Sequence, residues 1–130
     1  MQMSKEYEKI NKIVVEITTG KERKSATDDL IRLNIGSHQW ELNTANYDDY
    51  EKGITDIYEL DVPPGLDSSW FRFFCLDKKG RGKDDDWNLV KLVVKINDKI
   101  VYEKSDLDVW INAAHPSWCA PGFNYGQAGE

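Results

Sequence analysis

The chain has 130 residues, 40% of them hydrophobic and 12% aromatic, which is enough for one domain with its own core. Its 17 basic and 23 acidic residues give a net charge of -6, and this acidic balance argues against a nucleic-acid partner. No apolar run reaches the roughly 20 residues that a membrane-spanning helix needs. We therefore expect a soluble monomer, and the composition leaves open whether it comes from a larger secreted protein.

Alternation of apolar and polar residues, the pattern of half-buried β-strands, recurs along the whole chain. The predicted strands span residues 13–17, 30–35, 38–42, 54–62, 69–76, 87–96, 100–103 and 107–111. Turn signals separate them: Pro63-Pro64-Gly65 lacks amide donors for a sheet, and Asn97-Asp98 is typical of a tight hairpin. Eight short strands of this kind predict an antiparallel sandwich or barrel.

The predicted domain covers residues 11–112. Residues 1–10 are interpreted as an N-terminal linker, and residues 113–130, rich in Pro and Gly, as a C-terminal tail. The tail carries aromatic residues, among them Trp118, which we expect to fold back over an edge of the sandwich or to be partly disordered. Cys75 lies in an apolar run and is predicted to be a buried thiol. A bond to Cys119 stays open, because nothing local predicts it.

Short side chains with oxygen atoms gather in two of the predicted loops. Asp28 and Asp29 follow the first strand, and residues 43–53 contain several more Asn and Asp side chains. Calcium prefers ligands of this kind. The same carboxylates can also accept backbone N–H bonds in turns, so the residues alone do not distinguish the two roles.

The predicted loop 77–86 combines cations with an acidic run. Four cationic residues precede Asp84-Asp85-Asp86, namely Lys78, Lys79, Arg81 and Lys83. They form a candidate lipid-binding patch, in which each cation contributes about 1 kcal/mol near an anionic surface. The alternative is a solvated hairpin tip whose charges neutralise one another, and charge runs are more often of this kind.

Signs of catalysis are missing from the sequence. It contains no Gly-x-Ser-x-Gly, His-Glu-x-x-His or phosphate-binding glycine motif. A pair of His115 and Cys119 would lack a third group to orient the base, and His38 lies in a predicted strand. We therefore expect a domain that is not an enzyme.

Several short motifs occur in a defined order along the chain. They are Ile17-Thr18-Thr19-Gly20, Ala26-Thr27-Asp28-Asp29, Trp40-Glu41-Leu42, Asp49-Tyr50-Glu51-Lys52-Gly53, the aromatic run 70–74, Asp86-Trp87 and Trp110-Ile111. This order resembles the PLAT domain, also called the lipoxygenase-homology domain, and is closest in pattern to the carboxy-terminal domain of clostridial alpha-toxin phospholipases. The resemblance covers about residues 11–112 and implies a sandwich of two four-stranded antiparallel sheets.

The resemblance also implies calcium ligands at particular positions. The matching residues in this chain are Thr27, Asp28, Asn43 and Asp49. In the alpha-toxin-like members of the family, an aspartate and a glycine come just before the threonine that matches Thr27. This chain has Lys24-Ser25-Ala26 there, so the resemblance implies at most one calcium site. By the same comparison, Asp29 and Asp56 are expected to fix turns. Gly20 and Gly53 are expected to occupy turns with unusual backbone angles.

The function that the sequence predicts is that of a non-catalytic PLAT-like module for calcium-assisted membrane or lipid-surface binding. A metal-independent protein–protein interaction module is the first alternative. The second alternative is a carbohydrate-binding sandwich that uses exposed aromatic rings, because the same architecture serves lipid-binding and carbohydrate-binding modules. A rise of the melting temperature with calcium separates the first function from its alternatives, because a ligand that binds only the folded state stabilises it.

Overall fold

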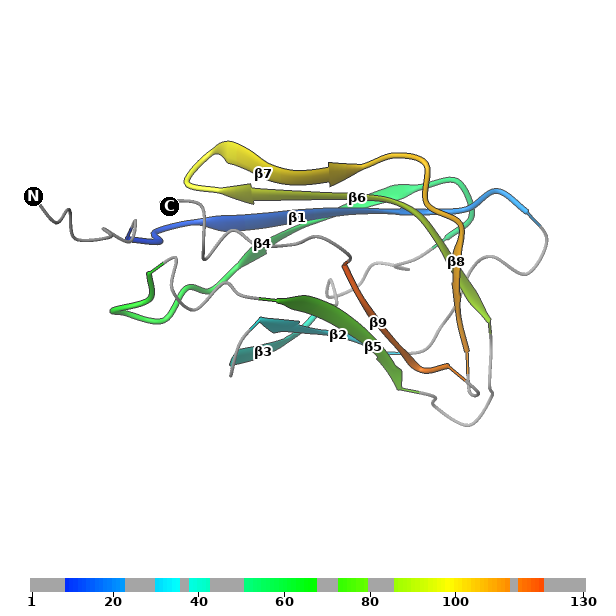
Figure 1. Cartoon of the computed structure of the whole chain (residues 1–130), viewed down its shortest axis with the longest axis horizontal. Coiled ribbons are helices and arrows are strands. Elements are labelled where there is room, and N and C mark those ends of the chain that lie inside the picture. Colours follow the sequence, from blue (N-terminus) through cyan, green and yellow to red (C-terminus); the bar gives the residue numbers. More distant parts are fainter. Residues whose placement is uncertain are drawn as a thin grey trace, which may run out of the picture.

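The computed structural model describes residues 9–22, 30–35, 38–42, 51–67, 73–79, 86–112 and 115–120. This part of the chain forms β-strands and no helix that is long and apolar enough to cross a bilayer. In chain order the strands are β1 (Ile13–Thr19), β2 (Leu30–Ile35), β3 (His38–Glu41), β4 (Thr55–Leu60), β5 (Phe74–Lys79), β6 (Trp87–Ile96), β7 (Lys99–Lys104), β8 (Val109–Ile111) and β9 (Ser117–Cys119). They form two antiparallel sheets packed face to face, which confirms the predicted β-sandwich (Figure 1).

The first sheet contains five strands, in the order β4-β1-β6-β7 with β8 also paired to β6. The prediction of two four-stranded sheets is therefore wrong in its strand count. The reason lies in the length of β6: β7 pairs with residues 92–96, which leaves residues 87–89 of the same edge free for β8. One long strand thus supports two short neighbours.

The second sheet has the order β3-β2-β5-β9. Its last strand, β9, comes from the segment predicted as a tail, and Trp118 packs against the core as expected for a tail that folds back. At the other end of the chain, Ile10 is 2% exposed and its amide donates to the carbonyl oxygen of Leu66 at 2.9 Å. The sandwich therefore extends beyond residues 11–112 on both sides.

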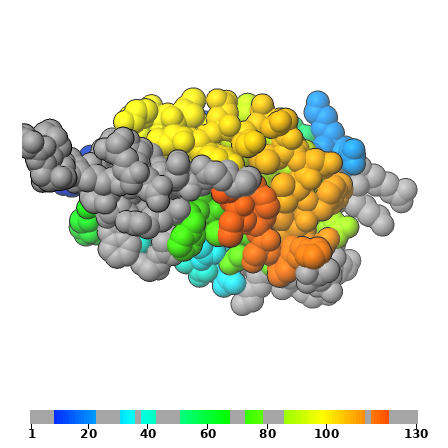
Figure 2. All heavy atoms as spheres, viewed as in Figure 1, coloured from blue at the N-terminus to red at the C-terminus, as the bar shows by residue number. Residues whose placement is uncertain are grey.

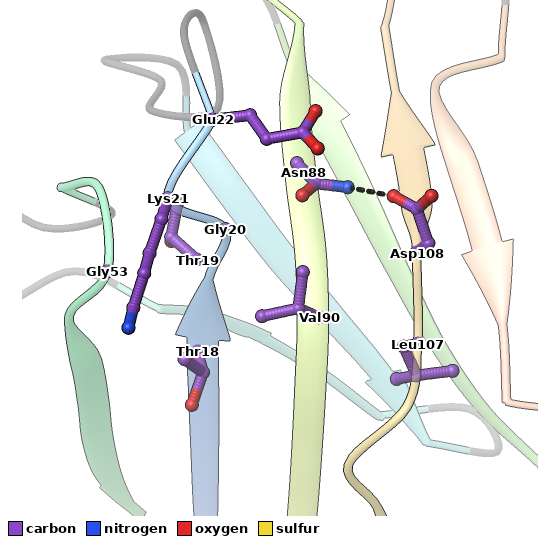
Figure 3. Close-up of a pocket in the computed structure, with 10 residues that line it drawn as sticks. All are labelled: Thr18, Thr19, Gly20, Lys21, Glu22, Gly53, Asn88, Val90, Leu107 and Asp108. Atoms are coloured by element: carbon purple, nitrogen blue, oxygen red, sulfur yellow. Dashed lines mark hydrogen bonds between the residues drawn. The ribbon is translucent and has the colours of Figure 1, made fainter.

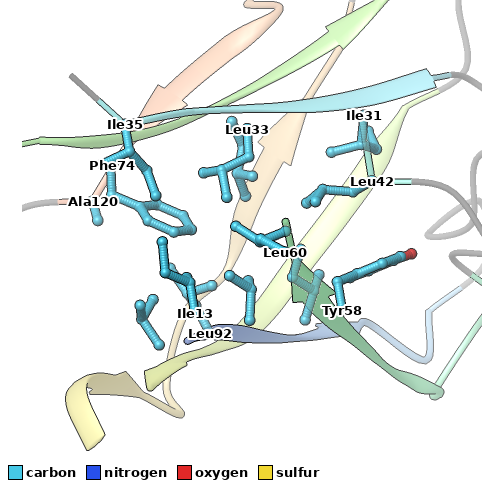
Figure 4. Packing of buried hydrophobic residues seen from close by; sticks show 14 of the residues in the cluster. Ile13, Ile31, Leu33, Ile35, Leu42, Tyr58, Leu60, Phe74, Leu92 and Ala120 are labelled. Atoms are coloured by element: carbon cyan, nitrogen blue, oxygen red, sulfur yellow. The ribbon is translucent and has the colours of Figure 1, made fainter. Parts of the chain in front are cut away.

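The core lies between the two sheets and is built from alternate residues of each strand. On β1, Ile13, Val15 and Ile17 are fully buried while the residues between them are partly exposed. The inner faces of β2 and β5 contribute further aliphatic side chains and Phe74 (Figure 4). Each fully buried side chain of this size contributes about 1.5–3 kcal/mol. The alternation of apolar and polar residues in the sequence reflects the burial of only one face of each strand.

The β6–β7 hairpin turns as the sequence predicts. Asn97 and Asp98 have φ angles of 50° and 67°, which the favoured two-residue hairpin turn requires. The Asn97 side chain also holds the segment before β1, because its Oδ1 accepts hydrogen bonds from the backbone amides of Asn11 and Lys12 at 2.8 and 3.1 Å. The turn thus fixes both the hairpin and the entry into the sandwich.

A disulfide joins the two cysteines. Cys75 on β5 and Cys119 on β9 are opposite each other in the strand register, with their Cα atoms 4.0 Å apart. The prediction of a buried free thiol at Cys75 is therefore wrong. No local pattern predicts the pair, because β9 is only three residues long and lies in a segment without alternating apolar and polar residues. In the space-filling view β9 forms part of the molecular surface (Figure 2).

Candidate functional site

Three connections between the sheets leave the sandwich at the same end. We call this the loop-bearing end: β1, β3 and β5 end there, and β2, β4 and β6 begin there. In the five-stranded sheet Thr18 pairs with Thr55 and Thr19 with Leu89, and in the four-stranded sheet Leu30 pairs with Lys79. Figure 1 shows these strand ends together on the right. The connections are residues 20–29, 42–54 and 80–86.

The residues predicted to bind calcium lie within two of these connections. Thr27, Asp28, Asn43 and Asp49 are all outside the described residues, so the calcium site stays a prediction. Within the described ranges no group of three or more His, Cys, Asp or Glu side chains could hold a metal ion.

Backbone hydrogen bonds tie these two connections to each other near both of their ends. The amide of Gly53, near the end of residues 42–54, donates to the carbonyl oxygens of Thr19 and Gly20, each at 3.1 Å. At the other side, the amide of Leu42 donates to the carbonyl oxygen of Ile31 at 2.9 Å, just after residues 20–29 enter β2. The segments that carry all four predicted ligands therefore start and finish beside one another.

The glycines in this region differ from each other. Gly53 has a φ of 71°, which confirms the prediction of an unusual backbone angle. The described glycines with positive φ are Gly53 and Gly65, so the same prediction for Gly20 is wrong. Gly20 instead continues from β1, and its amide donates to the carbonyl oxygen of Asn88 at 2.9 Å.

The first residue of the predicted cationic patch lies in a strand instead of a loop. β5 covers residues 74–79 rather than 69–76, so Lys78 lies in the strand and Lys79 is its last residue. Lys78 pairs with Ile31 and is only 6% exposed, so its placement in an exposed loop is wrong. The aromatic run before Phe74 suggested an earlier strand, but the inner face takes the alternate residues of 74–78. Arg81 and Lys83 lie outside the described residues.

Asp56 lies within β4, as the predicted strand 54–62 implies, opposite Ile17 and 4% exposed, and its expected role in a turn stays a prediction. On β4 it shares the buried face with Tyr58 and Leu60. Asp29, expected in a turn as well, is outside the described residues.

A cavity of about 330 Å³ opens on the outer side of the five-stranded sheet at the loop-bearing end (Figure 3). It is lined by residues 18–22, Gly53, Asn88, Val90, Leu107 and Asp108. These residues come from separate parts of the chain that only the pairing of β1, β4 and β6 brings together. The sequence has no motif that marks them, and its analysis missed this cavity.

Buried hydrogen bonds hold the wall of the cavity in place. Asn88 is 2% exposed, and its Nδ2 donates to Asp108 Oδ1 at 3.0 Å and to the carbonyl oxygen of Val109 at 3.2 Å. The amide of Leu107 donates to the carbonyl oxygen of Val90 at 3.1 Å. Asp108 and Leu107 are thereby fixed against β6.

The resolved pKa shifts belong to groups outside this cavity. Burial raises the pKa of Tyr102 on β7. A hydrogen bond from Lys12 to Asp98, together with the charge of that carboxylate, raises the pKa of the Lys12 ammonium. Neither group lines the cavity, so the proton chemistry of these two residues concerns stability rather than the site.

Comparison with known proteins places the fold. No protein-family model matches the chain. Phospholipase C from Clostridium haemolyticum is 28% identical over 116 residues, which cover 81% of this chain and 28% of that protein. Alpha-toxin from Clostridium absonum superposes with a TM-score of 0.76 at 22% identity, over 90% of this chain and 32% of the toxin. Coral 8R-lipoxygenase superposes with a TM-score of 0.67 at 20% identity, over 84% of this chain and 16% of that enzyme.

The chain spans less than a third of each of these relatives, so it corresponds to a part of them. The match to both alpha-toxin and lipoxygenase agrees with the order of motifs in the sequence, and the two packed antiparallel sheets agree with the fold that these motifs imply. We therefore identify the chain as a PLAT-like β-sandwich, similar to parts of the clostridial alpha-toxins and of the lipoxygenases.

Proposed function

We propose that the chain attaches to lipid surfaces through its loop-bearing end and that calcium assists this attachment. Two relatives support the proposal. One is a phospholipase C, and the other is a coral lipoxygenase whose structure is described as revealing calcium activation via a C2-like domain. Both properties belong to those proteins. The likeness in fold makes surface attachment the first function to test in this chain.

The observation that carries the proposal is the pairing of the two ligand-bearing connections. Thr27 and Asp28 belong to residues 20–29, and Asn43 and Asp49 to residues 42–54. The amides of Gly53 and Leu42 tie these two segments together near both ends, at 2.9 to 3.1 Å. Holding the ends of two segments side by side lowers the entropic cost of bringing ligands from both to one ion.

The chemistry of the predicted ligands fits calcium. They comprise two carboxylates, one amide oxygen and one hydroxyl, which are all hard oxygen donors. Calcium takes about 6–8 oxygens, so these four side chains leave room for backbone carbonyls, water and a lipid phosphate. A bound cation would also reduce the repulsion between an acidic chain and an anionic surface. Lys79 is the last residue of β5 at this end, and it would add to this attraction, as would Arg81 and Lys83, which follow it in the sequence.

In this proposal the chain provides attachment and no catalysis. The only cysteine near a histidine in the sequence is Cys119, and it is bonded to Cys75. A disulfide sulfur has no thiolate with which to attack a substrate, so the nucleophile of the one candidate pair is blocked while the bond is intact.

Sedimentation with vesicles tests the proposal. We expect the wild type to pellet with vesicles that contain an anionic phospholipid when calcium is present, and to remain in the supernatant when a chelator is added. Asp28→Asn should lose the calcium-dependent fraction. Asp61→Asn is the matched control, because Asp61 is exposed and follows β4 at the opposite end of the sandwich. Equal pelleting of the wild type and of Asp28→Asn at every calcium concentration would refute the role of calcium.

A calcium titration followed by calorimetry separates this function from a metal-independent protein-interaction module. Calcium at about 100 times its Kd should stabilise the folded state by about 2.7 kcal/mol. The alternative module predicts an unchanged melting temperature. The Asp28→Asn variant controls for calcium that binds elsewhere.

A further inference from the structure

The cavity at the loop-bearing end has an unused hydrogen-bond acceptor in its wall. Asn88 is 2% exposed, and its two Nδ2 protons are donated to Asp108 and to the carbonyl oxygen of Val109. Among the described residues no donor reaches Asn88 Oδ1. In Figure 3 this oxygen lies on the cavity side of the amide. Because Asn88 Oδ1 is accessible from the cavity, a ligand N–H group can bind it in place of water.

Two carboxylates lie beside this acceptor. Asp108 uses only Oδ1 for its bond with Asn88, which leaves Oδ2 available. Glu22 extends from the end of β1 across β6, toward Asn88 and Asp108 (Figure 3). The three groups together offer three acceptors and two negative charges. A primary ammonium group carries three N–H donors and one positive charge, so it fits this side of the cavity.

The other side of the cavity carries a cation. The aliphatic part of Lys21 lies over Gly53, where a Cβ would be 3.3 Å from Lys21 Cγ. Figure 3 shows the Lys21 ammonium pointing away from Glu22 and Asp108. Between the two sides, Val90 and Leu107 provide aliphatic contacts. The cavity thus has an acidic wall, an apolar floor and a cationic edge, which is the charge pattern complementary to a zwitterion with a short alkyl link.

We propose that this cavity binds the phosphoethanolamine headgroup of a phospholipid. The ammonium group donates to Asn88 Oδ1, Asp108 and Glu22, and the phosphate lies toward Lys21. A volume of about 330 Å³ is in the range of small-molecule sites. A choline headgroup fits less well, because its quaternary nitrogen has no N–H donor and is recognised by aromatic rings, which are absent from the described residues of the lining. This inference rests on the proposed function and names the lipid class that it would favour.

The first experiment uses soluble probes in the presence of a calcium chelator. Isothermal titration compares phosphoethanolamine, phosphocholine and N-acetyl-lysine amide. We expect phosphoethanolamine to bind at least about fivefold more tightly than the other two, because only it matches both charges and the N–H donors. Equal binding of the lysine amide would mean that the site takes an ammonium group from a protein, and equal binding of phosphocholine would mean that N–H donors do not matter. Either result would overturn the proposal.

Variants then connect the binding to the named side chains. Asp108→Asn keeps an oxygen for the bond from Asn88 but removes the charge, and Glu22→Gln does the same at the rim. Each should weaken phosphoethanolamine binding about threefold to tenfold. Asp106→Asn is the matched control: Asp106 is exposed, two residues away, and does not line the cavity. Equal weakening of phosphoethanolamine binding by Asp106→Asn would mean that the loss comes from the change in net charge, and it would contradict the assigned site.

Vesicles separate this inference from the proposed function. Phosphatidylethanolamine in phosphatidylcholine vesicles should increase pelleting of the wild type and of Asp106→Asn, but not of Asp108→Asn, with chelator present. Pelleting that is the same with and without phosphatidylethanolamine would refute the headgroup site and leave calcium-assisted attachment intact. Binding of soluble phosphoethanolamine without any vesicle binding would support the site and refute the proposed function. A preference that appears only with calcium would refute direct recognition by these side chains.

Discussion

Removal of the disulfide should strongly destabilise the domain. The bond closes a loop between positions 44 residues apart in the sequence. In the chain-entropy model a loop of that length lowers the entropy of the unfolded state by an amount worth about 4 kcal/mol at 25 °C. Stabilities of single domains are about 5–15 kcal/mol, so this is a large part of the total. Cys119 is exposed and Cys75 partly so, and for this reason Ala at both positions removes little buried surface.

Urea unfolding of the wild type and of the double variant Cys75→Ala/Cys119→Ala measures this contribution. At an m value of about 1.5–2 kcal/mol per molar urea, the midpoint should fall by about 2 to 3 M. Wild type treated with a reductant should behave like the double variant. A loss below about 1 kcal/mol would contradict the stabilising role of the disulfide, and two free thiols in the native wild type by thiol titration would contradict the bond itself.

Three further predictions concern packing, backbone and pH. Phe74→Ala should cost about 3–5 kcal/mol in chemical denaturation, because Phe74 is fully buried, whereas its neighbour Phe73, at 47% exposure, should cost much less; equal losses would contradict the assigned face of β5. Gly53→Ala should destabilise by about 1 kcal/mol or more, and by more than Gly65→Ala, since both have positive φ but only Gly53 has an atom close to the added Cβ; the reverse order would be inconsistent with the Lys21 contact. Because burial raises the pKa of Tyr102, the folded state keeps this proton to higher pH than the unfolded state, so the free energy of unfolding should fall as the pH rises above about 10. Tyr102→Phe should make this fall shallower. The same dependence of stability on pH in both proteins would argue against the shift.

The elements predicted well are those whose pattern is local. β2 and β6 match their predicted ranges, and the other predicted strands except 69–76 are within two residues of theirs. Their side chains alternate between core and solvent, so apolar and polar residues alternate in the sequence of each strand. The same holds for Asn97-Asp98, whose turn conformation depends on the residue types at those two positions.

The elements predicted poorly depend on contacts between distant segments. β9 is three residues long and gains its order from β5, to which it is paired and bonded through Cys75 and Cys119. Lys78 is charged and precedes a polar run, so the sequence favoured a loop there, but its position in the strand period puts it on the inner face. In both cases the partner strand decides the outcome.

The candidate sites divide in the same way. The calcium ligands follow from motifs at defined positions, and this resemblance names Thr27, Asp28, Asn43 and Asp49. The cavity at the loop-bearing end has no such motif, because Glu22, Asn88 and Asp108 meet only when β8 pairs with β6 and the end of β1 lies against it. No local pattern in the sequence connects these three residues.

The proposed function requires lipid and calcium to bind to the loop-bearing end together. If a lipid phosphate completes the calcium coordination, the coupling must be reciprocal: vesicles raise the affinity for calcium by the same factor by which calcium raises the affinity for vesicles. Calcium titration of the wild type by calorimetry, with and without vesicles that contain an anionic phospholipid, measures this factor directly. We expect tighter calcium binding when vesicles are present, and loss of this difference in Asp28→Asn. A calcium affinity that is the same with and without vesicles would contradict the proposed function.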